Sequence, residues 1–343
     1  MNNFYVTDIK LSELANITNM KIQSISRYFK NSGIDEKHIK VINNRIIGVS
    51  PNAAEIFLRH FGHDYFFRPS VLLFSNLCGG VGKTSGINNI SSFLRRIVSV
   101  EHPIFIIDAD SQSSLTEQKF GEMADESELT MIDYLDKKAT LNDIITDCGN
   151  NIFFLKSNFN LSGIDKVLSS AKRNKSAMYN LYMDIFNTYK NAYILQDCAP
   201  SLGTMFSSSV CGLYQLDNTI KKSILIPIRS DKTAIGGADK VLNEISDIKD
   251  TYSFQSEIPV HCYFANIDKR TTTTFEAIQD AKNKERVLNT LAGPYIRYSA
   301  ELIKNINQGT NLFGSKRTNH AALDFADLIQ YVYKDGESSN AKS

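Results

Sequence analysis

One short segment constrains this 343-residue chain more than any other: an apolar run that leads into a glycine-rich turn. Residues 71–77 read Val-Leu-Leu-Phe-Ser-Asn-Leu, and residues 78–85 read Cys-Gly-Gly-Val-Gly-Lys-Thr-Ser. A buried strand followed by such a turn brings backbone N–H groups close to a polyphosphate, while lysine adds a positive charge and threonine a hydroxyl for Mg²⁺. Apolar residues then recur at helical spacing, so a helix N-terminus also faces the anion. The segment predicts a nucleotide-binding loop.

The whole turn is expected to hold the nucleotide. Its residues are Gly79, Gly80, Val81, Gly82, Lys83, Thr84 and Ser85. Two further apolar runs end in aspartates: residues 104–112 carry Asp108 and Asp110, and residues 193–203 carry Asp197. In open α/β sheets the ligand lies beyond the carboxyl ends of the strands, so these carboxylates should converge on the turn. We expect Thr84 to bind Mg²⁺ directly and Asp197 to hold it through water.

These three motifs, in this order, resemble the ParA/MinD family, whose deviant phosphate loop reads Lys-Gly-Gly-x-Gly-Lys-Thr. The resemblance covers about residues 70–335 and implies that ATP and Mg²⁺ are the cofactors. It implies catalytic roles for Lys83, for Asp108 in the hydration shell of the metal, and for Asp110 in positioning or deprotonating the attacking water. It also implies that Asn266 contacts adenine. The alternative for Asp108 and Asp110 is capping of the next helix, although capping needs only one acceptor.

The chain departs from the family pattern at one position of the loop. Cys78 stands where the family has its signature lysine, which reaches across a two-fold axis to the partner's nucleotide. Cysteine has neither the length nor the charge for that contact. Nucleotide binding within one chain should remain, whereas turnover should be slow unless another basic residue substitutes, because such contacts are worth roughly 10³–10⁵ in rate. A small residue packed under the loop and a redox residue are the other interpretations of Cys78.

Composition limits the kinds of protein this chain can be. Its 38 basic and 37 acidic residues give a net charge of +1, so any DNA contact must be a local patch. Five scattered cysteines indicate reduced thiols, not a disulfide frame or a zinc site. The polar N-terminus does not resemble a signal peptide, and no apolar run approaches the ~18–20 residues of a membrane span. We expect a soluble cytoplasmic protein without membrane contact.

From residue 71 onward, strand and helix patterns alternate. Strands are expected at 71–75, 103–109, 152–156, 192–197, 222–228 and 258–265. Helices are expected near 83–98, 115–121, 130–146, 161–173, 176–190, 233–248 and 272–290. Strands that are apolar throughout are typical of a parallel sheet with helices on both faces. The pattern predicts a doubly wound, mostly parallel α/β fold at 67–335, with a polar tail at 336–343.

Residues 1–66 have a different pattern and predict a small separate domain. Helical patterns at 11–17 and 22–29 flank a polar break, which favours a helix-turn-helix. A hairpin or wing is expected at 39–49, followed by a helix at 53–60 that Pro51 opens. The exposed side chains of the second helix are the candidates for DNA contact. They are Gln23, Ser26, Arg27 and Lys30. A dimerisation or docking module and a plain capping subdomain remain open alternatives.

A second candidate DNA surface lies near the C-terminus of the chain. Residues 265–317 hold nine basic and five acidic side chains, which suits contact with phosphates. Arg270, Arg297 and Lys316 are the candidates. In ParA ATPases, basic residues in such regions bind DNA without reading its sequence, and this stretch is similar. A solvated rim is the alternative.

Taken with the resemblance, these features indicate a ParA-type ATPase for plasmid or DNA segregation. Such a protein would form an ATP-dependent homodimer on nonspecific nucleoid DNA and be stimulated by a ParB-like adaptor. Its N-terminal region would also suit an operator site. A nucleotide-switched repressor of its own operon and an ATPase that positions a protein cargo are the alternatives. An electron carrier like the nitrogenase iron protein would need paired cluster cysteines, and Cys198 has no evident mate.

Overall fold

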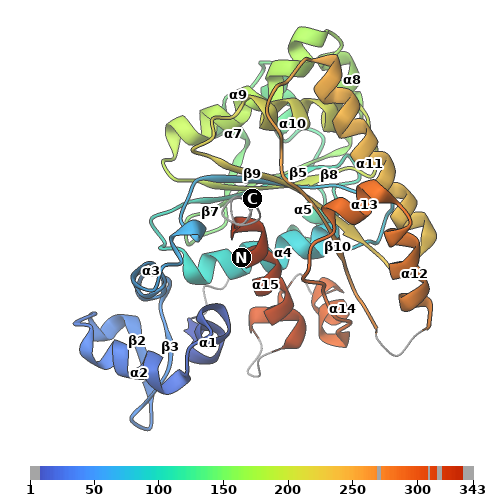
Figure 1. The fold of residues 1–343 in the computed structure, drawn as a ribbon. Helices are drawn as coiled ribbons and strands as arrows, with labels where there is room; N and C mark the ends of the chain where they lie inside the picture. The colour runs from blue at the N-terminus through green and yellow to red at the C-terminus, as the bar shows by residue number, and fades with distance from the viewer. Residues whose placement is uncertain (1–7, 269–271, 308–309, 315–318, 335–343) are drawn as a thin grey trace.

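The computed structural model describes residues 8–268, 272–307, 310–314 and 319–334. Their main feature is a seven-stranded sheet of order β10-β9-β4-β8-β5-β7-β6, with helices on both faces (Figure 1). Its strands are β4 (Ser70–Phe74), β5 (Ile104–Ala109), β6 (Ile145–Asp147), β7 (Ile152–Leu155), β8 (Tyr193–Cys198), β9 (Lys221–Ile228) and β10 (Val260–Phe264). Only the edge pair β6–β7 is antiparallel among these described strands. The predicted doubly wound, mostly parallel fold is confirmed.

Alternation along each strand divides the core between the two faces of the sheet. Leu72 and Phe74 of β4 belong to one apolar cluster, whereas Val71 and Leu73 belong to the other. The first cluster contains side chains of α4 (Lys83–Ile97) and α15 (His320–Lys334). The second contains side chains of α9 (Ala171–Thr188), α10 (Thr204–Gln215) and α11 (Lys232–Thr251). Because both faces are covered, the strands have no polar side, as the sequence pattern requires.

Three predicted helices are divided in the structure. The stretch 161–173 contains η3 (Phe159–Gly163) and α8 (Ile164–Val167), and α9 begins only at Ala171. The cause is local, because the hydroxyl of Ser170 accepts a hydrogen bond from the backbone N–H of Arg173, 3.2 Å away, and caps α9. The stretch 272–290 similarly forms α12 (Thr272–Lys282) and α13 (Glu285–Thr290).

The prediction of a single helix at 130–146 is wrong. Two capping boxes, at Thr130 with Asp133 and at Thr140 with Asp143, start the short helices α6 (Met131–Leu135) and α7 (Leu141–Ile144). The last residues turn into β6, which closes the edge of the sheet beside β7. The helix α5 (Ser114–Phe120) agrees with its prediction, whereas α10, α14 (Ala300–Asn307) and α15 were not predicted.

The N-terminal region contains the predicted elements and one additional strand. The helices α1 (Leu11–Thr18) and α2 (Ile22–Asn31) are joined by a short turn in which Asn19 has a left-handed φ of 55°. The short helix η1 (Glu36–His38) leads into a hairpin of β2 (Ile39–Ile42) and β3 (Arg45–Val49), and the unpredicted β1 (Ile9–Lys10) pairs with β3. The helix α3 (Pro51–His60) follows, with Ser50 as its cap.

This region packs directly on the helices below the main sheet (Figure 1). Its apolar residues, such as Leu14, Phe29 and Phe57, belong to the same cluster as α4 and α15. Arg96 near the C-terminal end of α4 forms a buried ion pair with Glu13 of α1, at 2.6 Å. The N-terminal elements therefore share one core with the nucleotide-binding fold, rather than having a core of their own.

Candidate functional site

The phosphate loop joins β4 to α4 at the carboxyl edge of the sheet. Gly80 and Gly82 have left-handed φ values of 66° and 104°, which glycine adopts without strain. Lys83 is buried, and its Nζ donates to the carbonyl oxygens of Asn76 at 3.3 Å and Cys78 at 3.5 Å. The ammonium group is therefore held across the loop by the backbone that begins it. Gly79 lies at the exposed rim, and Val81 packs into the core below.

A hydroxyl and a carboxylate meet immediately beside this loop. Thr84 Oγ1 donates to Asp197 Oδ2 at 2.7 Å, which joins the first turn of α4 to the end of β8. Among the described residues, the buried Oδ1 of Asp197 has no hydrogen-bond partner. Burial, together with the charge of Asp108, raises the pKa of Asp197 to about 7. A buried carboxylate oxygen without a partner is costly unless a cation or donor satisfies it, so this pair fits a magnesium ion.

Asp108 and Asp110 lie where the sequence predicts them, next to Asp197. Asp108 is opposite Asp197 in the parallel pairing of β5 and β8, and burial raises its pKa to about 6. Its Oδ2 accepts hydrogen bonds from the backbone N–H and the hydroxyl of Thr116 in α5, and its Oδ1 accepts from the N–H of Asp110. The carboxylate of Asp110 accepts from the N–H of Gln112. Both side chains thus support local structure, as the capping interpretation expects, and both are near enough to raise the pKa of Asp197 through their charge.

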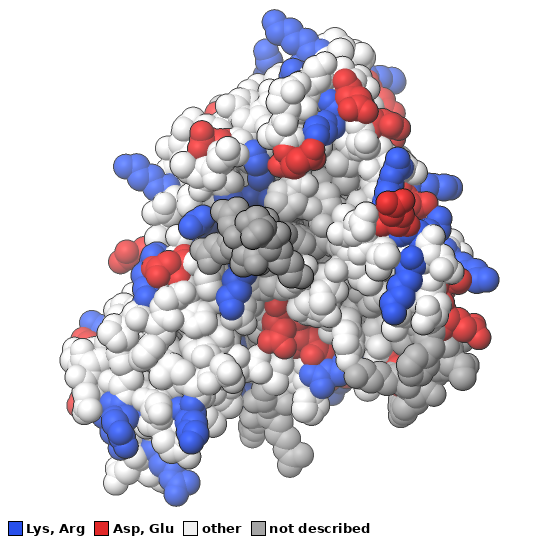
Figure 2. Space-filling view, viewed as in Figure 1, with Lys and Arg blue, Asp and Glu red and all other residues white. Residues whose placement is uncertain are grey.

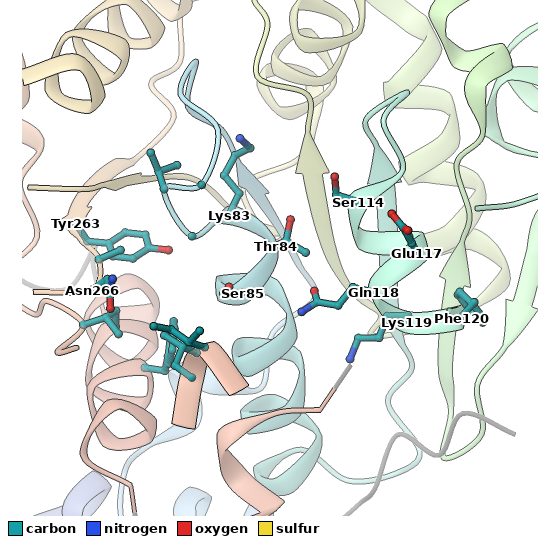
Figure 3. A pocket seen from close by; sticks show the side chains of 18 of the residues that line it. Lys83, Thr84, Ser85, Ser114, Glu117, Gln118, Lys119, Phe120, Tyr263 and Asn266 are labelled. Carbon is teal, nitrogen blue, oxygen red and sulfur yellow. The ribbon is translucent and has the colours of Figure 1, made fainter. Parts of the chain in front are cut away.

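A cavity of about 900 Å³ opens in front of the phosphate loop. Its walls come from five parts of the chain: the loop with the start of α4, α5, the end of β10, the segment before α14, and α14 with α15. Figure 3 shows Tyr263 and Asn266 on one side of the loop and Ser114, Glu117 and Gln118 on the other. The lining residues are Gly80, Val81, Gly82, Lys83, Thr84, Ser85, Ser114, Glu117, Gln118, Lys119, Phe120, Gly121, Tyr263, Ala265, Asn266, Ile296, Leu302, Ile303 and Phe325. Polar groups near the loop and apolar groups farther away suit a nucleotide.

Asn266 occupies a special backbone position at the rim of this cavity. It lies two residues after the end of β10, is exposed, and has a left-handed φ of 60°. The next residue, Ile267, donates its N–H to the carbonyl oxygen of Ile296 at 2.8 Å. This bond fixes the loop that presents the Asn266 amide to the cavity, and Phe325 and Leu302 supply apolar surface nearby. The arrangement suits a base, although the sequence patterns predicted only Asn266 among these residues.

The residues of α5, α14 and α15 are the part of the cavity that the sequence analysis missed. For α5 a signal existed, because the helix begins four residues after Asp110. Gln118 of α5 accepts a hydrogen bond from Asn88 of α4 at 2.6 Å, which ties the second motif to the phosphate-loop helix. The residues of α14 and α15 carry no motif, and only the packing of α15 on α4 brings them to the cavity.

Cys78 is packed against the start of α11. Its Sγ donates to the carbonyl oxygen of Thr233 at 3.3 Å, and it lies 3.2 Å from the position that a Cβ on Gly237 would occupy. The thiol is half-buried, and the described cysteines form no disulfide. This position agrees with the interpretation of Cys78 as a small residue packed beside the loop.

The N-terminal candidates for DNA contact share one outer face of α2. Ile25 and Phe29 are buried, whereas Gln23, Arg27 and Lys30 are exposed and Ser26 is partly exposed. Figure 2 shows lysine and arginine side chains at the lower left, over α2 and the hairpin. Two of the acidic residues of this region, Glu13 and Glu55, are buried. The surface of the region is therefore more basic than its sequence total indicates.

The C-terminal candidates for DNA contact fare differently. Arg270 and Lys316 lie outside the described residues. Arg297 makes a two-pronged bond with the buried Asp324, with Nε to Oδ2 at 2.8 Å and Nη2 to Oδ1 at 2.6 Å. Its guanidinium also donates to the carbonyl oxygen of His320. This side chain therefore anchors α15 beside the cavity, and DNA contact by Arg297 stays a prediction.

Two further properties limit the chemistry of the described residues. No helix among them is long and apolar enough to cross a membrane. No three His, Cys, Asp or Glu side chains within the described ranges are grouped as a metal site. A cation at Thr84 and Asp197 would accordingly take its other ligands from water and phosphate, which is the usual coordination of Mg²⁺.

Fold and loop together define a P-loop nucleotide-binding protein, and comparisons with known proteins agree. The model of a family described as AAA domain matches residues 70–260, more than half of the chain. The chain is 23% identical over 231 residues to the chromosome-partitioning ATPase Soj of Treponema pallidum (strain Nichols). That match covers 66% of this chain and 84% of Soj.

Solved structures share the fold. The ATP complex of a McdA variant from Cyanothece has a TM-score of 0.62 at 18% identity, covering 77% of this chain and 96% of that one. A candidate plasmid partition protein from Borrelia burgdorferi B31, bound to AMPPNP, has a TM-score of 0.59 at 19% identity, covering 78% and 99%. Cobyrinic acid a,c-diamide synthase from Mycobacterium smegmatis, with bound ADP and magnesium, has a TM-score of 0.57 at 20% identity, covering 78% and 96%. The chain belongs to the AAA domain family matched above, as a ParA/MinD-type member of these nucleotide-hydrolysing P-loop proteins.

Proposed function

We propose that this chain is a ParA-type partition ATPase that hydrolyses ATP with Mg²⁺. The observation that carries the proposal is the contact of Thr84 with Asp197 beside the phosphate loop, where a buried carboxylate oxygen lacks a partner. A triphosphate–magnesium unit supplies both the cation that this oxygen needs and the anion that the loop amides need. Nucleotides bound to relatives of the same fold support this assignment.

Each residue of the site has a role in this proposal. The N–H groups of residues 79–85 and the Lys83 ammonium hold the phosphates, and Thr84 and Asp197 hold the cation. Mg²⁺, when bound, neutralises the phosphate oxygens as negative charge develops. Asp110 positions or deprotonates the attacking water, Asp108 orders the water around the cation, and Asn266 contacts adenine. These roles require positioning and charge neutralisation, which dominate phosphoryl transfer.

In the wider cycle, ATP favours a homodimer that binds nonspecific DNA, and a ParB-like adaptor stimulates hydrolysis and release. The N-terminal region provides one DNA surface through Gln23, Ser26, Arg27 and Lys30. Arg270, Arg297 and Lys316 provide a second candidate surface. The likeness to Soj and to the Borrelia protein supports partition of DNA as the process.

Two substitutions test the ATPase proposal. Lys83→Ala should abolish ATP binding, measured by calorimetry in the presence of Mg²⁺, because it removes the cation at the phosphates. Asp110→Ala should bind ATP with nearly wild-type affinity but should not hydrolyse it. Lys232→Ala, which changes an exposed lysine near the site, is the matched control and should leave both properties unchanged. Normal hydrolysis by the Lys83→Ala variant would overturn the site assignment.

A second candidate function is a nucleotide-switched repressor of the operon that encodes the chain. Cys78 in place of a lysine favours it, because the loop then lacks a cation that speeds hydrolysis, and the basic face of α2 favours it too. A repressor should bind one operator sequence with nucleotide present and show no stimulation by an adaptor. Measured turnover that DNA and the adaptor protein increase would reject this candidate.

DNA binding by the N-terminal face can be tested with random duplex DNA across a salt series. Replacing both Arg27 and Lys30 by alanine should weaken binding and lower the slope of log affinity against log salt by about one for each lost phosphate contact. The matched control replaces Lys137 and Lys172, two exposed lysines on another part of the surface. Equal slopes for the two double variants would remove α2 from the DNA surface.

A further inference from the structure

The segment after β9 lies directly against the phosphate loop. Arg229 begins this segment, and its Nη1 is 3.6 Å from the position that a Cβ on Gly80 would occupy. Four residues later, the carbonyl oxygen of Thr233 accepts the hydrogen bond from Cys78 Sγ. The segment is thus bonded to the loop at Cys78 and brings a guanidinium group beside Gly80.

The position of Arg229 relative to the loop decides whose phosphates it can reach. Gly79 and Gly80 form the exposed rim of the loop, whereas Lys83 is buried below it. The guanidinium of Arg229 lies beside Gly80 at this rim, whereas the Lys83 ammonium is held by the carbonyl oxygen of Asn76 at the start of the loop. Half of the Arg229 side chain is exposed to solvent. It is therefore accessible to the nucleotide of a second copy that approaches this rim.

Asp231 holds this arginine in place. The Nε of Arg229 donates to Asp231 Oδ2 at 2.5 Å. Asp231 is itself fixed, because its Oδ1 accepts the N–H of Ala234 at 2.9 Å and caps α11. The pair thus uses the Nε edge of the guanidinium and leaves Nη1 directed towards Gly80. An arginine held by one edge against a helix cap is prepared to bind an anion with the other edge.

The phosphate loop has a charge deficit that such an arginine would correct. Lys83 is the only basic side chain in residues 78–85, and position 78 is a cysteine packed against α11. We propose that Arg229 of one copy contacts the phosphates of the nucleotide held by a second copy, and stabilises the charge of the transition state. This inference rests on the proposed ATP-dependent dimer and names the residue that completes each site from across the interface.

Substitution of Arg229 tests the charge. Arg229→Ala should lower single-turnover hydrolysis by about a hundredfold or more, while the affinity for ATP changes only a few-fold. Arg229→Lys should retain more activity than Arg229→Ala, because it keeps a cation at the same place. Lys232→Ala is again the matched control, because it removes a neighbouring exposed cation that lies 3.9 Å from Asp280. Unchanged hydrolysis by Arg229→Ala, with a melting temperature equal to wild type, would overturn the proposal.

Mixing two inactive variants tests the placement across the interface. Asp110→Ala keeps Arg229 and binds ATP, whereas Arg229→Ala keeps Asp110. In a mixed dimer, the nucleotide on the Arg229→Ala copy meets an intact Arg229 from its partner, so hydrolysis should reappear at about a quarter of the wild-type rate for equal amounts and random pairing. A tag on one variant confirms that mixed dimers form. Mixed dimers without activity would show that Arg229 does not act from across the interface.

These outcomes separate the inference from the proposed function. A wild-type protein that binds no ATP overturns both together. Wild-type turnover with an unchanged Arg229→Ala variant overturns only the inference, because the loop, Thr84 and Asp197 would then suffice.

Discussion

The two ends of helix α4 show how one element serves different purposes. At its N-terminal end, Thr84 contacts Asp197, whose second oxygen has no partner among the described residues. Near its C-terminal end, Arg96 is equally buried, but Glu13 accepts from it at 3.0 and 2.6 Å, and the carbonyl oxygen of Asp8 accepts a further bond at 2.9 Å. We call the N-terminal end of α4 the open end, because a buried carboxylate there has an oxygen without a partner in the described part of the chain. We call the C-terminal end the closed end, because the buried charges there are paired with each other.

The closed end also satisfies the backbone of the helix. Arg95 is fully buried, and its Nη groups donate to carbonyl oxygens just beyond the helix, including those of Val98 and His102. Cationic side chains at a helix C-terminus are favourable because the unpaired carbonyl groups there carry partial negative charge. Glu55 of α3 accepts the N–H of Ser99 in the same place. This end of α4 therefore fastens the N-terminal region to the nucleotide-binding fold.

The contrast teaches that buried charge has to be interpreted through its partners. A buried ion pair is stabilising relative to a half-broken one, and it has no need of a ligand. A buried carboxylate with an unsatisfied oxygen destabilises the empty protein and gains most when a ligand arrives. Substitutions at the two ends should accordingly have opposite effects on folding and on nucleotide binding.

The largest effect is expected when the closed end is broken. Arg96→Met leaves Glu13 buried without its cation and should lower the free energy of unfolding by about 3–5 kcal/mol. Affinity for ATP, measured at a temperature where the variant is folded, should stay close to that of wild type. Urea unfolding gives the first quantity and calorimetry the second.

Two controls sharpen this prediction. The double variant Arg96→Met with Glu13→Leu should be more stable than Arg96→Met alone, because no unpaired charge remains. Lys37→Ala breaks an exposed pair with Asp35, where 70% and 56% of the side chains are accessible, and should cost well under about 1 kcal/mol. If Arg96→Met were as mild as Lys37→Ala, the ion pair would not be what fastens the two regions.

The part of the fold that the sequence could predict follows from periodic burial. Strands such as 104–107 are apolar on both faces, so their number and the parallel sheet could be predicted from pattern alone. The division of 130–146 was missed, although Thr130 with Asp133 and Thr140 with Asp143 are capping boxes that the sequence displays. The helix α15 was not predicted, because its apolar spacing follows a stretch without any motif.

The residues of the site also divide into those that the sequence predicts and those that only the tertiary structure shows. Motif residues such as Lys83, Thr84 and Asp197 could be predicted, because their chemistry requires a fixed spacing after a strand. Arg229 and Phe325 could not, since they approach the loop only through the register of β9 beside β4 and the packing of α15 on α4. The pairing of Arg297 with Asp324, 27 residues away, also depends on tertiary structure.

Neutralising the carboxylate at the open end should raise the free energy of unfolding, whereas breaking the ion pair at the closed end lowers it. Asp197→Asn keeps an acceptor for Thr84 but removes the buried charge, so the ligand-free protein should gain about 1–3 kcal/mol in urea unfolding. The extra stability that Mg²⁺–ATP gives to wild type should be lost in this variant.

The matched control for Asp197→Asn is Asp324→Asn. Asp324 is a buried aspartate with a satisfied carboxylate, because Arg297 binds both of its oxygens. The Asp324→Asn variant should be less stable than wild type in urea unfolding. Mg²⁺–ATP should still stabilise it as much as it stabilises wild type. If both variants changed the free energy of unfolding in the same direction, the unpartnered oxygen of Asp197 would not be what makes this carboxylate destabilising.

The smallest effect is expected from the pH dependence of the closed end. Burial alone would raise the pKa of Glu55, but hydrogen bonds from His102, the Ser99 N–H and Arg59 outweigh it and lower the pKa to about 2. In the unfolded chain the value is 4.5, so the stabilising contribution is complete above pH 4.5 and is lost as the pH falls to about 2. Because Arg59 and His102 are partly exposed, roughly 1–2 kcal/mol should disappear over that range.

Glu55→Gln should remove this part of the acid sensitivity, whereas Glu36→Gln, at an exposed position of η1, should keep the wild-type profile. Urea unfolding at a series of pH values measures the difference. Parallel profiles for wild type and Glu55→Gln would mean that Glu55 does not stabilise the closed end through its charge.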